Sequence, residues 1–481
     1  MKRLLFASLL FGCCVGMPAQ SEIESFQQYR QDMLKRYDNY RRDLLNSYAD
    51  YLDKMWEQVE GKRPQQRFHR PKPHTVPTAP SPQPADPQCP ANPMPEPTVT
   101  PVPHPIPTEP FPQTPPPCNP VRQQVAVNFY GLQLTLPKVK LPTDHLAQFA
   151  NGDAIKALNA SNFETEAFPA FRQQVEKMQL ADYFVLELVA AYTKSLLPQA
   201  SKEARANLEL YMLLLNGYDV RPGMDSGTPL LLVPYAQQVY SHSYSTLGDA
   251  NYYVYNADLE KNNEVGTFRT PPFSSPLTGL RALDLVIHRP MQMNGNRFHY
   301  SHSYNGIQIE GTLDERLMKM VLHYPQMPIP CYAQSVLEEG VHREVESQMK
   351  AQIGTQKNLK NVNSLLHFVQ QGFDYATDDE QFGFEKPFFF EELLYYPKCD
   401  CEDRSVFYAT LLRALWQVDN HLVGFPNHEC VALSLPGENI VGTFYTRDGA
   451  NYYISDPTYL GSDTGMCAPN YLNCTPDVQP W

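Results

Sequence analysis

Three residues near the carboxyl end of this 481-residue chain have the types and the order that thiol catalysis requires. Cys401 lies in PKCDCEDRSVFYATLLRALWQV, His428 in GFPNHECVALSLP and Asp456 in NYYISDPTY. In a thiol enzyme a cysteine attacks, a histidine takes or shares its proton, and a carboxylate orients the imidazole. The pattern therefore predicts Cys401 as nucleophile, His428 as general base and Asp456 as the orienting acid.

The segment after Cys401 is apolar nearly all round, which predicts a helix buried in the core with Cys401 at its amino terminus. Unpaired backbone N–H groups at a helix start favour a thiolate, the reactive form of cysteine. The adjacent carboxylates of Glu402 and Asp403 work against it.

The two partners of Cys401 place a demand on the topology. His428 precedes an expected strand at 429–435, and Asp456 ends another at 452–455. If residues 440–446 formed a strand between them in a simple meander, His428 and Asp456 would lie roughly 20 Å apart. The triad therefore requires residues 436–450 to be an excursion and the two outer strands to pair directly as antiparallel neighbours.

DCEDRSVFYATLLR, the histidine before a strand, YYISDPTY and the preceding QQGFDYATDDEQFGFEKPFFFEELLYY together resemble the transglutaminase-like superfamily of bacterial cysteine enzymes, in its secreted form. The resemblance covers residues 356–481 and implies an α+β fold with a papain-like transglutaminase core. It implies the same three catalytic residues, with Asp403 as a structural partner at the helix start. The sequence departs from the family pattern at Cys399, where a glycine is usual.

The implied chemistry is attack on a peptide or carboxamide carbonyl to give a thioester. Hydrolysis would make a protease or amidase, and capture by an amine would make an acyltransferase. Hydrolysis is slightly favoured, because nothing in the sequence indicates a pocket for an amine. Gln381 is a candidate side-chain donor to the oxyanion. The alternative function is a non-catalytic cell-envelope binding module on the same fold.

No cofactor and no metal is expected. A zinc site is the alternative for part of the same region, since Cys399, Cys401, His428 and Cys430 have suitable chemistry. One-residue spacings within both pairs are unusual for structural zinc, so the triad is preferred.

The amino terminus predicts export. Lys2 and Arg3 precede an apolar run, Leu4–Gly12, and the first acidic residue is Glu22, as in a signal peptide covering residues 1–19. The protein is then periplasmic, on the cell surface or extracellular, with a lipid on Cys13 as the alternative. No other apolar run is long enough to span a membrane. A net charge of -13 argues against nucleic acid as a partner.

An oxidising compartment permits disulfides. Cys467 and Cys474, at the two ends of CAPNYLNC, are the candidate pair. A bond between Cys399 and Cys430 would stiffen the predicted site, whereas a bond to Cys401 would silence it.

The remaining chain divides by composition. Residues 20–60 contain eleven-residue blocks starting at Phe26, Tyr37 and Tyr48, which predict an amphipathic helix with an aromatic stripe. The stripe is expected to pack on the protein's own globular domain or to self-associate, with docking on a partner as the alternative. Residues 61–120 form a Pro-rich linker, since 22 of the 45 prolines lie at 64–120. Residues 121–355 are expected to be a mixed α/β accessory region. The expected partner of the whole is a peptide or protein substrate.

Overall fold

The computed structural model describes residues 28, 36, 39–66, 76–80, 92–99, 123–240, 242–256, 266–272 and 277–481. The predicted signal peptide, Cys13 and the block that starts at Phe26 lie outside these ranges, apart from residues 28 and 36. Within the ranges, every helix is too short or too polar to cross a membrane.

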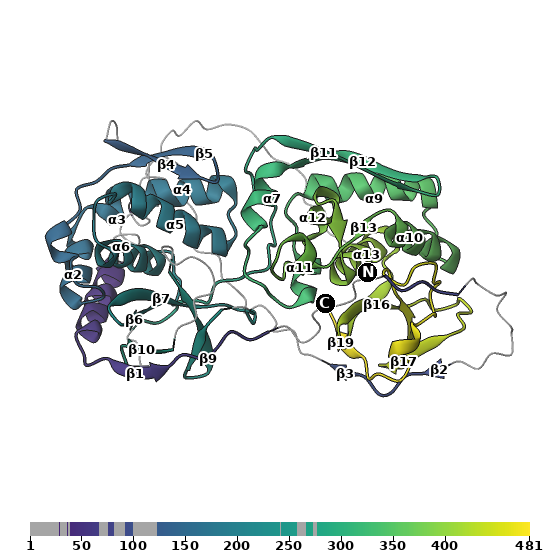
Figure 1. Ribbon diagram of the computed structural model, residues 1–481. Coiled ribbons are helices and arrows are strands. Elements are labelled where there is room, and N and C mark those ends of the chain that lie inside the picture. Colours follow the sequence, from purple (N-terminus) through teal and green to yellow (C-terminus); the bar gives the residue numbers. More distant parts are fainter. Residues whose placement is uncertain are drawn as a thin grey trace, which may run out of the picture.

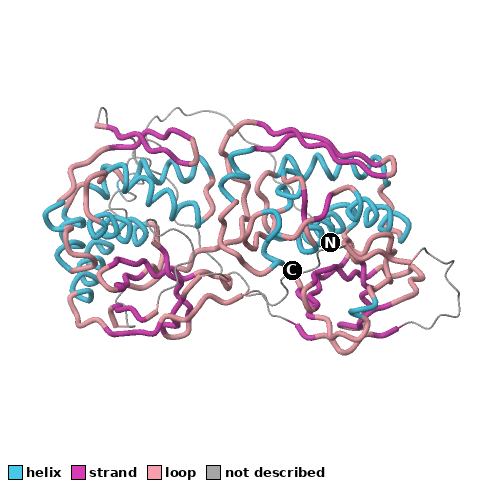
Figure 2. The backbone as a smooth tube through the Cα atoms, viewed as in Figure 1, coloured by secondary structure: helices cyan, strands magenta, loops and turns pink. Residues whose placement is uncertain are grey.

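The chain is a mixed α and β protein with two lobes, and in each lobe helices lie on one side of a curled, mostly antiparallel sheet (Figures 1 and 2). In the first lobe the sheet order is β1-β10-β6-β7-β9-β8. Its elements are β1 (Glu57–Glu60), β4 (Gln124–Phe129), β5 (Leu132–Pro137), η1 (Thr143–His145), α2 (Gly152–Ala160), α3 (Phe163–Glu166), α4 (Phe168–Met178), α5 (Asp182–Leu196), α6 (Lys202–Leu215), β6 (Arg221–Asp225), β7 (Thr228–Pro234), β8 (Tyr244–Leu247), β9 (Ala250–Tyr255) and β10 (Thr267–Thr270).

The second lobe is built around α13 and a sheet of order β2-β17-β18-β16-β15-β19-β3. Its elements are β2 (Asn92–Pro93), β3 (Thr98–Val99), β11 (Arg297–Tyr304), β12 (Ile307–Asp314), α7 (Glu315–Val321), α8 (Ile329–Gln334), α9 (Glu339–Ile353), α10 (Leu359–Gln371), β13 (Asp374–Tyr375), α11 (Asp378–Gln381), α12 (Phe390–Tyr395), β14 (Lys398–Cys399), α13 (Cys401–Trp416), β15 (Asp419–Phe425), β16 (His428–Ser434), β17 (Thr443–Arg447), β18 (Ala450–Ser455), η2 (Pro469–Tyr471) and β19 (Asp477–Gln479). The β11–β12 hairpin and α7–α9 lie in this lobe, so the predicted boundary at residue 355 falls inside it (Figure 1).

Helix α13 is the centre of the second lobe. It starts at Cys401 as expected, and all its residues from 401 to 409 are buried against β15, β16 and α8. Its end is set by Gln417, whose left-handed φ of 53° terminates the helix. The apolar sequence on all sides thus matches a helix that is surrounded by protein.

The residues of the aromatic stripe that the structure describes pack on the first lobe. Residues 39–52 are helical, and Tyr48 and Tyr51 are buried in the same core as α2 and α6. The Asp53 carboxylate accepts a 2.7 Å hydrogen bond from the backbone N–H of Gly152. The helix stops before the predicted residue 60, because residues 57–60 form β1 and pair with β10. Tyr48 and Tyr51 therefore pack within this chain.

The described pieces of the Pro-rich segment lie along the second lobe. Strand β2 pairs with β17, and β3 pairs with β19. Thr78 bridges to Leu460, and Ala79 packs with Tyr459 and Ala468. A segment expected to be a free spacer therefore adds edge strands to the sheet that carries His428.

Each lobe contains one copy of the same helix-and-sheet unit. Strands β8-β9-β7-β6-β10 follow the same order as β17-β18-β16-β15-β19, and α6 precedes the first set as α13 precedes the second. The registers also agree: Leu231 pairs with Tyr255 and Val431 with Ser455, so equivalent residue numbers differ by 200. We call residues 202–270 the first unit and residues 401–479 the second unit.

One hydrogen bond recurs in both units. The hydroxyl of Tyr252 donates to Asp219 Oδ2 at 2.6 Å, and the hydroxyl of Tyr452 donates to Asp419 Oδ2 at 2.6 Å. Both tyrosines come from an Ala-Asn-Tyr-Tyr sequence, at 250–253 and 450–453. The two units therefore share only a short sequence motif, and the repeat is recognised from their shared strand order.

This shared bond predicts equal structural roles. Tyr252→Phe and Tyr452→Phe should each lower the free energy of unfolding of their own lobe by about 1 to 2 kcal/mol, because each leaves a carboxylate without its phenol donor. Urea unfolding followed by tryptophan and tyrosine fluorescence measures this. Tyr453→Phe, on the same strand, is the control and should change stability by less than about 0.5 kcal/mol. A loss at one position only would contradict the equivalence.

Candidate active site

The sheet of the second unit brings His428 and Asp456 together. Strands β16 and β18 are direct antiparallel neighbours, and β17 lies on the far side of β18. This confirms the pairing that the sequence analysis required, with residues 436–450 as an excursion that also contains β17. His428 Nε2 lies 2.8 Å from Asp456 Oδ2, and both side chains are buried.

Asp456 is held rigidly where β18 ends. Its Oδ1 accepts the backbone N–H groups of Thr458 and Tyr459 at 2.8 and 3.2 Å, which leaves Oδ2 for the imidazole. A carboxylate fixed by two backbone donors fixes the imidazole in turn. With Nε2 facing Asp456, Nδ1 is the nitrogen left for exchange with a thiol.

Cys401 lies beside the start of β16. The backbone N–H of Glu429, the residue after His428, donates to Cys401 Sγ at 3.4 Å. The thiol in turn donates to Glu402 Oε2 at 3.2 Å. In the described part of the chain the hydrogen bonds of Cys401 go to these neighbours and not to His428. The thiol and the His428–Asp456 pair are therefore adjacent but not hydrogen-bonded to each other.

The resting state of Cys401 is a thiol. Complete burial raises its pKa well above the ordinary value, and the carboxylates of Glu402 and Asp400 raise it further. The Glu429 N–H lowers the pKa, but by less. The helix start favours a low pKa for Cys401, but burial and the flanking carboxylates raise the pKa by more than the helix start lowers it.

Two buried histidines of this sheet have opposite electrostatics. Burial lowers the pKa of His428, but the charge and hydrogen bond of Asp456 outweigh it, so the net pKa is raised. His421 on β15 bonds the Tyr445 hydroxyl at 2.8 Å, and burial lowers its pKa to about 4. Of these two histidines, His428 is the one whose pKa lies above the ordinary value, and its neighbour Asp456 stabilises the imidazolium once a proton has been taken up.

Tyr471 covers the imidazole. Its ring stacks on His428 with centroids 4.9 Å apart and planes 6° apart, and it also stacks on Phe425. Cys401 is 0% exposed and His428 is 2% exposed. Both side chains are therefore closed to solvent, and Tyr471 is one of the groups that cover His428.

Asp403 ties two segments together. Its Oδ2 accepts the backbone N–H of Asp400 at 3.0 Å, and its Oδ1 accepts that of Phe388 at 2.9 Å. These are the contacts expected of a structural carboxylate at a helix start, and they anchor the segment before α12 to α13.

The Gln381 amide donates one N–H to the carbonyl of Lys398 at 3.2 Å, and its role as an oxyanion donor stays a prediction. A residue that the sequence analysis missed is Tyr375 on β13, paired with Cys399 of β14. Its hydroxyl is buried and makes no hydrogen bond within the described chain. Burial raises its pKa, and the charges of Cys401 and Asp400 raise it further.

The other cysteines in the described ranges, namely Cys331, Cys399, Cys430, Cys467 and Cys474, are free thiols. Cys399, at the position where a glycine was expected, donates to the Asp374 carbonyl and accepts from Arg404 Nε at 3.4 Å. Among the described residues the set Cys399, Cys401, His428 and Cys430 does not converge as a metal-binding group. Cys467 and Cys474 are unbonded here and interact electrostatically, so their disulfide stays a prediction.

The first unit has lost the triad residues. With the same difference of 200 residues, Ser201, Thr228 and Asn256 stand for Cys401, His428 and Asp456. Thr228 begins β7 as His428 begins β16, and Asn256 follows β9 as Asp456 follows β18. Ser201 caps α6 by accepting from Ala204 N at 3.2 Å. The fold is kept in both units, and the thiol, imidazole and carboxylate occur only in the second.

Comparisons of the chain with protein-family models, with curated proteins and with solved structures find no match.

The surroundings of the His428 imidazole predict the direction in which its pKa is shifted and how that pKa depends on Asp456. His428 should titrate above the ordinary value of ~6.5, and Asp456→Asn should lower that pKa because burial then dominates. A raised folded-state pKa means that the stabilisation from this pair is fully present below pH ~6.5 and is lost as the pH rises through the folded pKa. NMR of the imidazole nitrogens measures both, with His421 as the internal control that stays neutral down to about pH 4. Titration of His428 below ~6.5 would contradict the arrangement.

Proposed function

We propose that the chain is an exported cysteine enzyme with a papain-like, transglutaminase-type core, acting on peptide or carboxamide bonds through Cys401, His428 and Asp456. The observation that carries the proposal is the buried 2.8 Å pair of His428 and Asp456 beside a thiol at a helix start. The first unit strengthens the proposal, because it has the same fold and lacks the thiol, the imidazole and the carboxylate. The three groups are therefore not required by the fold.

The chemistry follows from the positions of the atoms. As the thiol proton passes to Nδ1 of His428, Cys401 Sγ attacks the carbonyl carbon and its oxygen becomes an oxyanion. The imidazolium, stabilised by Asp456, then gives the proton to the leaving nitrogen, and a thioester is left on Cys401. Water completes a hydrolysis, and an amine completes a transfer. Hydrolysis stays slightly favoured, as in the sequence analysis.

The oxyanion needs donors near Cys401. The hydroxyl of Tyr375 is a stronger candidate than Gln381, because Tyr375 pairs with Cys399, two residues before the nucleophile, and its buried hydroxyl makes no hydrogen bond within the described chain. One N–H of the Gln381 amide, in contrast, is bonded to Lys398. A donor already free of hydrogen bonds costs no reorganisation when the charge develops.

The alternative is a non-catalytic cell-envelope binding module on the same fold. The observation that favours it is the closed site: Cys401 is 0% exposed and Tyr471 lies over His428. The enzyme proposal therefore includes an opening step in which Tyr471 leaves the imidazole. Export through residues 1–19 and a peptide or protein substrate belong to the proposal too.

The proposed triad predicts a loss of activity when any of its three residues is replaced. Cys401→Ala should abolish turnover of peptide and carboxamide substrates, and His428→Ala should lower kcat/KM by at least about 1000-fold. Asp456→Ala should cost less, since the orienting acid contributes less than nucleophile or base in related triads. Thr228→Ala, the equivalent position in the first unit, is the matched control and should leave activity unchanged.

Iodoacetamide labelling with peptide mapping separates the enzyme from the binding module. The proposal expects Cys401 to label faster than Cys331, a buried cysteine whose pKa burial raises to about 12. Equal rates at the two positions, with no turnover of any substrate, would leave the binding module as the function.

Tyr375 generates a separate prediction. Tyr375→Phe removes only the hydroxyl and should lower kcat on a substrate that the wild type turns over by about 100-fold. Alkylation of Cys401 by iodoacetamide forms no oxyanion, so its rate should not change. An equal loss in both assays would mean that Tyr375 only supports the fold.

A further inference from the structure

The segment that carries Tyr471 is tied to the rest of the lobe by few hydrogen bonds. We call residues 466–475 the cover segment, because the ring of Tyr471 lies over His428. Within the described chain, every hydrogen bond of the cover segment ends on a residue between 463 and 474. Local hydrogen bonds do not fix a segment to its surroundings, so the position of the cover segment depends on side-chain packing.

Two pieces of the Pro-rich region supply part of that packing. The side chain of Ala79 is buried against Tyr459 and Ala468, and Tyr471 packs against the same cluster. Met94 belongs to a second apolar cluster, on which Tyr471 also packs. Residues far from the cover segment in the sequence therefore support the ring that lies over the imidazole.

The backbone of the first piece is bonded to the loop that follows β18. Residues 76–80, which we call the strap, form a parallel bridge to Leu460. The N–H of Ala79 donates to the Leu460 carbonyl at 2.7 Å, and the Leu460 N–H donates to the Pro77 carbonyl at 3.0 Å. Pro77 and Pro80 restrict the strap to extended conformations, so it loses little conformational entropy when it docks.

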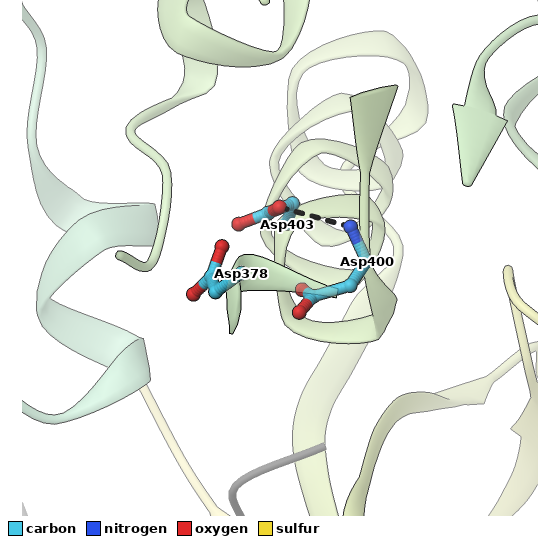
Figure 3. Close-up of side chains that lie close together, drawn as sticks. All are labelled: Asp378, Asp400 and Asp403. Atoms are coloured by element: carbon cyan, nitrogen blue, oxygen red, sulfur yellow. Dashed lines mark hydrogen bonds between the residues drawn. The ribbon is translucent and has the colours of Figure 1, made fainter. Parts of the chain in front are cut away.

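The surroundings of Cys401 on the side of α11 are closed by tightly bonded side chains. Asp378 of α11 faces Asp400 and Asp403 at the start of α13, and all three are buried (Figure 3). Asp403 also accepts the backbone N–H groups of Phe388 and Asp400, which ties this side together. The cover segment lacks such ties, so an opening of the site is favoured there.

The first unit separates the strap from the part of the Pro-rich region that serves the fold. Strand β3 pairs with β19, the strand that follows the cover segment. In the first unit β1 takes the same place beside β10. Because the first unit has the fold without the triad groups, an edge strand at that place belongs to the architecture. The strap lies elsewhere, at the loop after β18, and is not accounted for in this way.

We propose that the strap holds the cover segment over His428 and keeps the active site closed, and that release of the strap from Leu460 opens the site. The proposal rests on the proposed function, since it concerns access to Cys401. Ala79 connects the two parts, because its backbone bonds Leu460 while its side chain packs against Ala468 of the cover segment. Two hydrogen bonds and one buried methyl group form a weak hold, which suits a contact that is broken reversibly. The strap is then an inhibitory element within the same chain.

The rate at which iodoacetamide alkylates Cys401 in the full mature chain tests the strap. Ala79→Pro removes the N–H that donates to Leu460, and it should raise this rate about tenfold, since the loss of such a hydrogen bond shifts an opening equilibrium by that factor. Thr78→Pro is the matched control, because the Thr78 N–H makes no hydrogen bond within the described chain. Its rate should stay within about twofold of the wild type.

A double-mutant cycle shows whether the strap acts through the cover segment. Tyr471→Ala removes the ring over His428 and should raise the alkylation rate by itself. In that background Ala79→Pro should add less than about twofold, because the ring that it releases is already gone. Hydrogen exchange of the Leu460 amide reports release of the strap independently of the thiol, and it should be faster in Ala79→Pro than in the wild type.

Faster exchange at Leu460 with an unchanged alkylation rate of Cys401 would overturn the proposal, because the strap would be released without opening the site. If exchange is unchanged in Ala79→Pro, the test passes to Ala79→Glu, which places a charge against Tyr459 and Ala468. Unchanged exchange in both variants would mean that these contacts do not hold the strap, and the proposal would fall equally. Faster alkylation without turnover of any substrate would support the strap and refute the enzyme function, so the two failures are distinguishable.

Discussion

The direct pairing of β16 with β18 is the constraint on which the candidate site depends. The register that sets Val431 opposite Ser455 brings the first residue of β16 and the residue after β18 to the same end of the sheet. Had β17 lain between these strands, the chain would contain the same residues without a histidine–carboxylate pair. The backbone donors of Thr458 and Tyr459 then fix Asp456, and Asp456 fixes His428. The geometry of the candidate triad is thus a consequence of strand order.

The start of α13 adds a second constraint, which is electrostatic. A helix start attracts negative charge, yet this one carries Asp400, Cys401, Glu402 and Asp403 together in a fully buried setting. Burial raises the pKa of the Cys401 thiol, and the carboxylates add to that effect in the same direction. A reactive thiolate and an uncompensated cluster of carboxylates are incompatible at such short range. In the structure as it stands, the surroundings of Cys401 therefore favour the neutral thiol over the thiolate.

The parts of the site that depend on neighbouring residues in the sequence were predicted from the sequence. The apolar run after Cys401 predicted a buried helix. Pro457, which cannot continue a strand, predicted that the preceding strand ends next to Asp456. The antiparallel pairing followed because the alternative strand order was geometrically incompatible with a triad. The features that were not predicted depend on contacts between residues far apart in the sequence. The Gln381 amide donates to Lys398, and Tyr375 is brought to the residues before Cys401 by the pairing of β13 with β14. Pieces of the Pro-rich segment pair with the sheet edges. The repeated unit escaped too, because its sequence signal is little more than Ala-Asn-Tyr-Tyr.

The repeat bears on which residues serve the fold and which serve chemistry. A bond present in both units, such as that from Tyr252 to Asp219 and from Tyr452 to Asp419, is needed by the architecture itself. Groups present in one unit only are free of that requirement, and burying a charge without a structural need is unfavourable. Asp400, Glu402, His428 and Asp456 are all of this second kind, since the first unit folds with Ala200, Lys202, Thr228 and Asn256 in their places. Because folding alone does not account for these buried charges, their cost is offset by something that the second unit does and the first does not.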